Sequence, residues 1–261
     1  MSFDLFRHIV DELKPYRSQI EKFDLWGLGE PLLDKNLFEK IRYAKDSGLP
    51  SIAIATNADL LNGKTQDLLD SGIDVVIFSI DGARKDTHEG IRIDVNFDNV
   101  VENALCSIEL RDRGGYDTRF VFRFIRQDAN AEEWPDFRDF WSAQVSQHKG
   151  DVVSCYDVHS WGGEIAVPVR GGLVPDDAPC HHVFDRMIIL WDGTVPLCCA
   201  DMHHADYTLG NVRDESPVEV FNSPRMKEIR ELHLGGRRKE MRICRDCTIL
   251  QSEAAQQIAE V

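Results

Sequence analysis

Four cysteines near the C-terminus are the residues of this chain best suited to chemistry. Cys180 and Cys198 lie on either side of a short apolar run, and Cys244 and Cys247 are separated by two residues. A Cys-x-x-Cys knuckle on a tight turn lets two sulfurs face the same ion or cluster. If both pairs meet, they offer four thiolates, a set that suits tetrahedral zinc and an iron–sulfur cluster equally well.

A predicted β-hairpin would bring the first two cysteines together. The apolar run 187–191 is followed by Asp192-Gly193, a strong turn signal, and residues 194–197 lead back to Cys198. The plain alternative is that these are unrelated buried thiols, because free cysteine is among the most buried residue types. A disulfide framework is disfavoured, since nothing in the sequence indicates secretion.

Composition excludes several classes of protein. The chain has 261 residues, enough for one large domain or two, and a net charge of −15 that argues against a nucleic-acid binder. Its N-terminus is amphipathic and acidic, unlike a signal peptide, and no apolar run is long enough to span a bilayer. We therefore expect a reducing cytoplasm and no membrane partner, a setting in which clustered cysteines are more often metal ligands than disulfides.

Helical and strand patterns alternate over the first 158 residues. The chain opens on an amphipathic helix, with Ser2 as its N-cap and apolar residues at helical spacing from Phe3 to Leu13. Strands are predicted at 23–26, 51–56, 74–80, 119–125 and 152–158. Further helices are predicted at 36–47, 64–70, 97–109 and 132–145. This alternation predicts an α/β fold with a parallel sheet covered by helices.

A change in composition suggests a domain boundary. Gly162-Gly163 and Gly171-Gly172 occur among Pro168, Pro175 and Pro179. We place the first domain at residues 1–165 and the second at 166–261, with the tail 251–261 as a polar helix or frayed end.

Unusual residues follow three of the predicted strands, where parallel β/α folds place their ligand sites. The three segments are Gly27-Leu28-Gly29-Glu30-Pro31, Thr56-Asn57-Ala58 and Ser79-Ile80-Asp81-Gly82. Glu30 could bind an ammonium group, and Ser79 and Asp81 could bond hydroxyls. Each segment alone is as typical of a loop start, a helix cap or a turn.

Taken together and in this order, the three segments resemble the core of a radical S-adenosylmethionine (SAM) enzyme followed by a SPASM or twitch domain. The first resembles the family's Gly-Gly-Glu-Pro motif, with Leu28 in place of a glycine, the second its Thr-Asn-Gly, and the third its Ser-x-Asp-Gly. The resemblance implies a partial (β/α) TIM-like barrel that lacks its first strand. It also implies SAM contacts, which would be made by Gly27, Gly29, Glu30, Pro31, Thr56, Asn57, Ser79 and Asp81.

The cysteine spacing extends the resemblance. Twelve residues separate Cys180 from Gly193, four separate Gly193 from Cys198, and no cysteine follows Cys247. This is similar to the shorter twitch form, which implies one auxiliary [4Fe–4S] cluster held by Cys180, Cys198, Cys244 and Cys247 and favours iron–sulfur over zinc.

The remaining cysteines and the histidines of this region take other roles under this hypothesis. Cys199 is a spare thiol or an alternative ligand, and Cys106 and Cys155 are expected to be buried and inert. Because four cysteines satisfy a cubane, the neighbouring histidines are read as residues of the hairpin face or the edge of an active site. These are His181, His182, His203 and His204.

The motif that holds the family's SAM-cleaving cluster, Cys-x-x-x-Cys-x-x-Cys, is missing, since no cysteine precedes Cys106. The chain as written is therefore not expected to cleave SAM. We favour a false or internal start, with the motif upstream of Met1; the other explanation is a shortened protein that keeps the barrel and auxiliary cluster for binding or electron relay. A barrel without its first strand would expose a sheet edge, an aggregation hazard.

The resemblance implies an oxidoreductase or maturase lineage, with a sugar-like alcohol or another small molecule, or a peptide, as substrate. It also implies an electron-donor protein of the flavodoxin or ferredoxin type. Candidate substrate contacts are Arg123, Arg126, Trp161 and Glu164. Two hypotheses from other classes stay open: a non-catalytic iron–sulfur binding or electron-relay module, and a zinc-stabilised structural protein.

Overall fold

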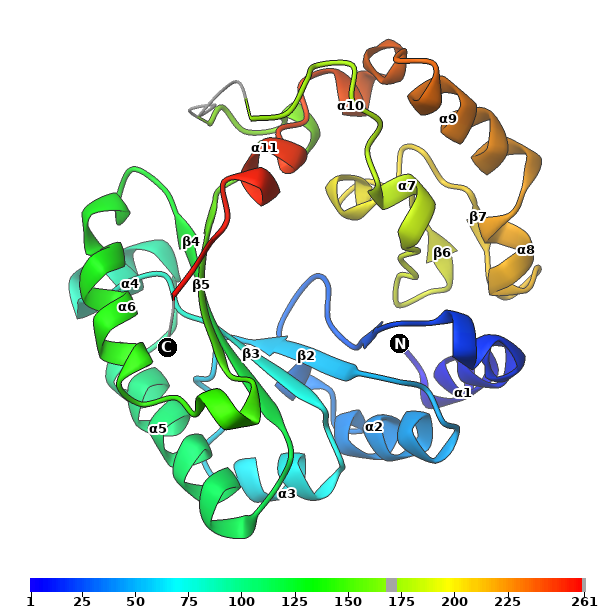
Figure 1. Cartoon of the computed structure of the whole chain (residues 1–261). Helices are drawn as coiled ribbons and strands as arrows, with labels where there is room; N and C mark the ends of the chain where they lie inside the picture. Colours follow the sequence, from blue (N-terminus) through cyan, green and yellow to red (C-terminus); the bar gives the residue numbers. More distant parts are fainter. Residues whose placement is uncertain (168–172, 260–261) are drawn as a thin grey trace. The chain divides into compact units, whose positions relative to one another are not determined.

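The computed structural model describes residues 1–167 and 173–259, and the chain forms two compact units (Figure 1). The sheet unit consists of Arg17–Asp157 and the residues from Gln256 onward, and the cysteine unit consists of Met1–Tyr16 and Val158–Ala255. The N-terminal helix thus belongs to the same compact unit as the cysteine region. The domain boundary at 165/166 stays a prediction, and Pro168 and Gly171-Gly172, part of its basis, lie outside the described residues.

The sheet unit is built on parallel strands that follow one another in chain order. They are β1 (Phe23–Asp24), β2 (Ile52–Thr56), β3 (Val75–Ser79), β4 (Arg119–Arg126) and β5 (Val152–Asp157). The helices between them are α2 (Leu37–Asp46), α3 (Thr65–Asp70), α4 (Lys85–Ile91), α5 (Phe97–Gly114) and α6 (Trp134–Ser142). Helices α2, α3, α5 and α6 cover one face of the sheet (Figure 1). The predicted α/β class and its β/α alternation are confirmed; α4 was not predicted.

Aromatic packing and one buried ion pair hold the centre of this unit together. The Phe78 ring stacks on Phe122, with centroids 4.9 Å apart. Arg111 of α5 and Asp151, which precedes β5, form an ion pair in which both side chains are wholly buried. Asp151 also accepts a hydrogen bond from the backbone N–H of Phe120 at 2.8 Å, and Arg111 lies 4.4 Å above the Phe120 ring. The pair therefore fixes α5 against the starts of β4 and β5.

The tail of the chain differs from the expected polar helix. Helix α11 (Ile249–Ala254) ends early, and Gln257–Ile258 form β8, which pairs antiparallel with β5. The N–H of Ala259 also donates to the carbonyl of Val153 at 2.9 Å. An open strand edge offers backbone partners that a frayed helix end lacks, so the extended form is favoured; residues 260–261 lie outside the described part.

Helix α1 (Phe3–Leu13) opens the cysteine unit as predicted, with the Ser2 side chain accepting from the N–H of Leu5. Its apolar face packs Leu5 and Ile9 against Val195, Val212 and Val220. The other elements of this unit are α7 (His182–Asp185), β6 (Thr194–Val195), β7 (Gly210–Asn211), α8 (Pro217–Phe221), α9 (Pro224–Leu234), α10 (Arg242–Arg245) and α11. In the described residues of the two units together, short 3₁₀ helices occur at Lys14–Gln19, Pro31–Leu33, Ala131–Glu133, Gln147–Lys149, Trp161–Gly163, Cys199–Asp201 and Arg238–Glu240.

The hairpin of this unit differs from the predicted one. The Asp192-Gly193 turn forms, with the N–H of Leu190 donating to the carbonyl of Thr194 at 2.8 Å. However, β6 pairs with β7, and the run 187–191 is not a strand. The turn signal marks where the chain reverses but does not select the ladder partner, and here Val195 and Val212 share a buried cluster.

No helix among the described residues is long and apolar enough to cross a membrane.

Candidate metal centre

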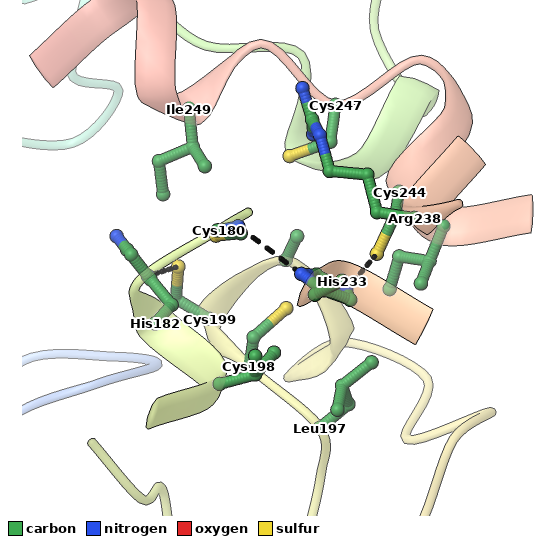
Figure 2. A pocket seen from close by; sticks show the side chains of 13 residues that line it. Cys180, His182, Leu197, Cys198, Cys199, His233, Arg238, Cys244, Cys247 and Ile249 are labelled. Carbon is green, nitrogen blue, oxygen red and sulfur yellow. Dashed lines mark hydrogen bonds between the residues drawn. The ribbon is translucent and has the colours of Figure 1, made fainter. Parts of the chain in front are cut away.

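Five cysteines of the cysteine unit line one small cavity of ≈ 20 Å³ (Figure 2). They are Cys180, Cys198, Cys199, Cys244 and Cys247. In Figure 2 the sulfurs of Cys198, Cys244 and Cys247 point toward a shared space. The structure thus brings the four predicted residues together, with Cys199 beside them; their role as ligands stays a prediction.

Backbone hydrogen bonds to Asp201 shape the loop that carries Cys198 and Cys199. Its buried carboxylate accepts from the N–H of Leu197 at 3.1 Å and from the N–H of Tyr207 at 3.2 Å. A single carboxylate therefore closes the loop between β6 and β7 on both sides of the two thiols.

The Cys244–Cys247 knuckle is held by Ser160 and Thr248. The Ser160 hydroxyl donates to the carbonyl of Asp246 at 2.7 Å and accepts from the N–H of Thr248 at 3.1 Å. The Thr248 hydroxyl in turn accepts from the N–H of Ser160 at 2.9 Å. These reciprocal bonds fix the knuckle to a segment 88 residues away in the chain.

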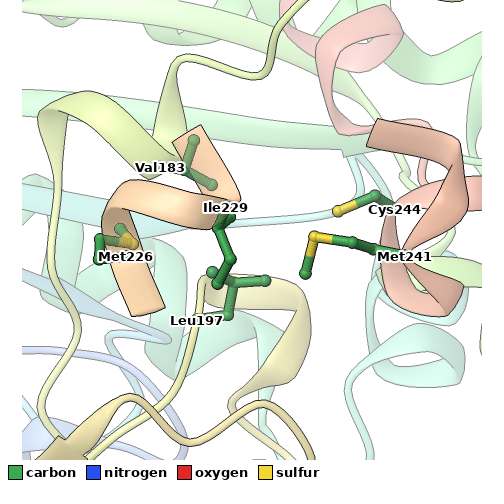
Figure 3. Close-up of a cluster of buried hydrophobic side chains, with 6 residues drawn as sticks. All are labelled: Val183, Leu197, Met226, Ile229, Met241 and Cys244. Carbon is green, nitrogen blue, oxygen red and sulfur yellow. The ribbon is translucent and has the colours of Figure 1, made fainter. Parts of the chain in front are cut away.

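An apolar core supports one side of the cavity (Figure 3). It consists of Val183, Leu197, Met226, Ile229, Met241 and Cys244. Because Cys244 is itself a member, its sulfur stands at the boundary between this core and the other thiols. A low-dielectric wall of this kind disfavours a thiolate that has no cation beside it.

Burial dominates the acid–base behaviour of the thiols. It raises the pKa of Cys180 to about 11 and the pKa values of Cys199 and Cys244 to about 12. Burial, and then the neighbouring Cys199, raise the pKa of Cys198 further. These thiols are therefore protonated at neutral pH unless a metal displaces the protons.

Arg238 supplies positive charge to the same cavity. Its side chain is 6% exposed, and its Nε has no hydrogen-bond partner among the described residues. Its charge lowers the pKa values of Cys180 and Cys244, against the larger effect of burial. A buried guanidinium with an unused donor fits an anionic thiolate-bound group, whichever metal that group contains.

The sulfurs are not gathered as closely as ligands of one zinc ion would be. Among the described residues, the one group of histidine, cysteine or acidic ligand atoms that all lie within 4.8 Å of one another is His181, His182 and Glu253. No set of three cysteine sulfurs meets that limit, whereas zinc–sulfur bonds of about 2.3 Å place tetrahedral ligands about 3.8 Å apart. The cysteines are thus more widely spread than a single zinc ion requires.

His233 of α9 was not predicted to belong to this site. It is 1% exposed, its Nδ1 accepts from the N–H of Cys180 at 3.2 Å, and its Nε2 lies 3.8 Å from the sulfur of Cys244. Burial, and then the charge of Arg238, lower the pKa of His233 to about 4. The neutral ring must therefore carry its proton on Nε2, facing Cys244. The signal in the sequence is its position on the buried stripe of α9, with Met226 and Ile229.

The histidines that were predicted divide into two pairs. His182 is buried and lines the cavity, with Nδ1 3.7 Å from the sulfur of Cys199, whereas His181 is exposed. His203 packs edge-on against Trp161, and His204 lies 3.4 Å from Glu164. Of these four histidines only His182 therefore lines the cysteine cavity.

The two other cysteines lie in the sheet unit. Cys155 of β5 is buried, as predicted. The prediction that Cys106 is buried is wrong: it is exposed, because the buried stripe of α5 runs through Val100, Ala104, Ser107 and Arg111 and leaves residue 106 on the other side.

The loop after β1 is joined to the end of β2 through Glu30. The Glu30 carboxylate accepts from the hydroxyl of Thr56 at 2.8 Å, from the N–H of Asn57 at 2.8 Å and from the N–H of Leu32 at 3.1 Å. Gly29 has a φ of +86°, which favours glycine at that position. Two of the three predicted SAM-contact segments thus form one polar cluster.

Asp81 and Ser79 lie at the end of β3 and bind arginines. Asp81 accepts from Arg92 at 2.7 Å and from the N–H of Ile125 at 2.9 Å. Ser79 accepts from Arg123 at 3.1 Å, and the Arg123 guanidinium lies 5.2 Å from the Trp26 ring.

The two arginines predicted as substrate contacts differ in their partners. Burial lowers the pKa of Arg123, and its Nε has no hydrogen-bond partner in the described part of the chain. Arg126 is held by Asp157 at 2.7 Å. Arg123 therefore keeps an unused donor at the strand ends, and substrate contact by either arginine stays a prediction.

Known proteins resemble this chain in sequence. Residues 180–248 match the SPASM family, described as an iron–sulfur cluster-binding domain. The chain is 33% identical over 111 residues to the AdoMet-dependent heme synthase of Methanosarcina barkeri, a match that covers 42% of this chain and 30% of that protein. The chain therefore spans well under half the length of that relative.

Two solved structures share the fold over nearly the whole chain. BtrN in complex with AdoMet and 2-DOIA superposes with a TM-score of 0.60 and 16% identity, covering 95% of this chain and 80% of that one. Streptococcus suis SuiB bound to precursor peptide SuiA superposes with a TM-score of 0.61 and 14% identity, covering 93% and 63%. At these identities the likeness shows a common fold.

Proposed function

We propose that this chain, a radical SAM protein of the SPASM type, holds one auxiliary [4Fe–4S] cluster on Cys180, Cys198, Cys244 and Cys247. The observation that carries the proposal is the convergence of these thiols in one cavity that also holds the buried Arg238. The match of residues 180–248 to an iron–sulfur cluster-binding domain supports it. The wide spacing of the sulfurs favours a cluster over a single zinc ion.

A cluster bound here supplies a one-electron donor or acceptor. The chain's own residues would hold the cluster and stabilise its charge. Arg238 offsets negative charge on the thiolates, the His233 Nε2 proton faces Cys244, and the Asp201 and Ser160 hydrogen bonds hold the two ligand loops.

We further propose that the strand-end segments of the sheet unit contact SAM. The residues are Gly27, Gly29, Glu30, Pro31, Thr56, Asn57, Ser79 and Asp81. The presence of AdoMet in the BtrN complex and in the name of the heme synthase supports this assignment. Glu30 is the proposed acceptor for the ammonium group of SAM, because its loop is fixed to the end of β2.

We also propose an enzyme lineage and a class of substrate. An oxidoreductase or maturase that acts on a small molecule or a peptide is supported by BtrN, bound to 2-DOIA, and by SuiB, bound to a precursor peptide. A flavodoxin-type or ferredoxin-type electron donor and a cytoplasmic location stay predictions. So does a Cys-x-x-x-Cys-x-x-Cys motif upstream of Met1, which is checked by reading the preceding DNA in frame.

Anaerobic reconstitution with iron and sulfide tests the cluster. We expect about four irons and four sulfides per chain, with the broad visible absorbance of a cubane. Cys180→Ser, Cys198→Ser, Cys244→Ser and Cys247→Ser should each lose most of this iron, whereas Cys106→Ser, on the other compact unit, should retain it. If Cys199→Ser loses iron and Cys198→Ser retains it, the ligand assignment is wrong. One zinc per chain without sulfide would overturn the cluster itself.

A second candidate function is a non-catalytic iron–sulfur module, which would use the same cysteine cavity. It predicts that the reconstituted chain holds its iron but forms no 5′-deoxyadenosine from SAM under a strong reductant. Detection of that product, absent from the Cys180→Ser and Cys244→Ser variants, would refute the module.

A further inference from the structure

Beside the cysteines, two histidines and a glutamate form a separate cluster. His181 and His182 stand at the start of α7, and Glu253 lies on α11. One ligand atom from each lies within 4.8 Å of the other two. The Glu253 carboxylate is 2.7 Å from Nε2 of His181 through one oxygen and 2.8 Å from Nε2 of His182 through the other.

Asp185 adds a fourth group behind His181. Its carboxylate lies 2.7 Å from Nδ1 of His181. Carboxylates only accept, so both ring nitrogens of His181 face acceptors, and each contact requires either a proton or a cation. One proton on Nδ1 satisfies Asp185 and fixes the tautomer in which the Nε2 lone pair points at Glu253. A carboxylate behind a ligand histidine is the usual outer partner in metal sites.

We propose that His181, His182 and Glu253 bind one divalent first-row metal ion such as Zn²⁺, Fe²⁺ or Mn²⁺, in a second site that adjoins the cysteine cavity through His182. Two imidazoles and one carboxylate form the ligand set that zinc and non-haem iron sites use while leaving coordination positions open. The ion occupies the space between the Nε2 atoms of the two histidines and the Glu253 carboxylate, and it replaces the proton that His182 otherwise shares with Glu253. Asp185 keeps its hydrogen bond to His181 and orients the ring.

The exposure of the groups indicates what the open positions face. The His182 side chain is only 2% exposed, whereas those of His181 and Glu253 are 47% and 31% exposed. One ligand is thus rigidly placed by the interior, and the other two stand at the surface. The ion would therefore present its free positions to water, or to an oxygen ligand that arrives from solution.

His204 and Glu164 provide a matched control. They form a similar histidine–carboxylate pair, 3.4 Å apart, on the same compact unit. Among the described residues no third ligand atom joins that pair within the same limit. A metal site requires the third ligand, whereas a simple ion pair does not.

The test titrates the cluster-loaded full chain with Mn²⁺ and, separately, with Zn²⁺. Mn²⁺ prefers oxygen and nitrogen ligands to thiols, and its binding is followed by loss of the EPR signal of the free aqua ion. Zn²⁺ binding is followed by equilibrium dialysis. The Zn²⁺ experiment uses a Cys106→Ser background, because that change removes the exposed thiol. We expect about one ion per chain beyond the iron. Glu253→Gln and His181→Gln should weaken binding at least ~10-fold, and Asp185→Asn by about 10- to 100-fold. Glu164→Gln should leave the affinity for either ion unchanged.

Absence of a bound ion in both titrations would overturn the site, and so would equal affinity in the Glu253→Gln and native chains. Iron content is measured in the same samples. A chain that lacks its four irons but binds Mn²⁺ contradicts the cysteine assignment alone, whereas a chain with full iron and no Mn²⁺ contradicts only this site. His181→Gln, at an exposed position, keeps the test decisive if Glu253→Gln fails to fold.

Discussion

Replacement of Glu30 by glutamine tests the link between the first two strand-end segments. One carboxylate oxygen accepts from Thr56 and Leu32, and the other accepts from Asn57. Glutamine has only one acceptor oxygen, so its NH₂ group must face at least one of these donors. Hydrogen bonds to charged groups contribute about 1.5–3 kcal/mol each. We therefore expect a loss of about 2–3 kcal/mol in the free energy of unfolding.

The assay is urea unfolding, read from the midpoint at constant slope. Thr56→Val removes the hydroxyl that donates to Glu30 and also accepts from the N–H of Ala58 at 3.0 Å, whereas Thr56→Ser keeps both bonds and should remain within about 0.5 kcal/mol of the native chain. The double variant of Glu30→Gln and Thr56→Val should cost less than the sum of the single changes, by about 0.5–3 kcal/mol.

The reasoning fails if Glu30→Gln unfolds within about 0.5 kcal/mol of the native chain, because the three bonds would then carry no net stability. It also fails if the two changes are additive, since Glu30 and Thr56 would then act independently. SAM binding by equilibrium dialysis provides the functional readout, and Thr56→Ser is again the control. A SAM affinity unchanged in Glu30→Gln would remove Glu30 from the proposed contacts.

Three further predictions follow from buried charges and histidines. Asp151→Ala should lower the free energy of unfolding by about 3–5 kcal/mol, because it removes the buried partner of Arg111 and leaves only the half-exposed Asp112 beside that charge; a loss under about 1 kcal/mol by urea titration would show that Asp112 and water suffice for Arg111. Burial lowers the pKa of His88 from 6.5 to about 4, so the unfolded chain takes up the proton first and stability falls as pH drops from 6.5 toward 4. At pH 5 this costs about 2 kcal/mol relative to pH 7, and His88→Asn, compared with exposed His148→Asn, should remove that part of the slope. Finally, His233→Leu should speed loss of iron from the reconstituted chain, whereas His233→Gln, whose amide can donate toward Cys244, should retain iron longer; equal rates of loss would assign His233 a packing role.

The sequence allowed the sheet unit to be predicted nearly in full. Its strands are short apolar runs bounded by turn residues, and its helices repeat apolar residues at helical spacing, so periodicity locates both. Helix α4 was missed because Lys85–Ile91 contains few apolar residues and gains its place from His88, which is buried against Phe97. Burial of one histidine leaves no periodic signal.

Pairings between distant segments were harder to predict. The turn at Asp192-Gly193 was visible, but its partner strand at Gly210–Asn211 is only two residues long and contains a glycine, so it has no strand signal of its own. The strand at Gln257–Ile258 depends equally on the open edge of β5. Register between such segments is set by tertiary packing rather than by local preference.

The candidate site also contains some residues that the sequence indicated and others that it did not. Cysteine spacing indicated Cys180, Cys198, Cys244 and Cys247, because a tight turn constrains sulfurs in a manner that spacing records. His233 and Arg238 reach the cavity through α9 and the loop that follows it, Asp201 holds the loop that carries Cys198 and Cys199, and no motif marks any of the three. Residues that tune or support a site are found only once its surroundings are known.

The path of the chain between its two compact units has a practical consequence. The chain passes from one unit to the other after Tyr16, after Asp157 and again after Ala255. A gene cut at any single codon therefore leaves one product without a piece that its own fold uses: the half with the cysteines loses α1, or the half with the sheet loses the strand that caps β5. Independent expression of the cysteine unit would require deletion of residues 17–157, which joins residue 16 directly to residue 158.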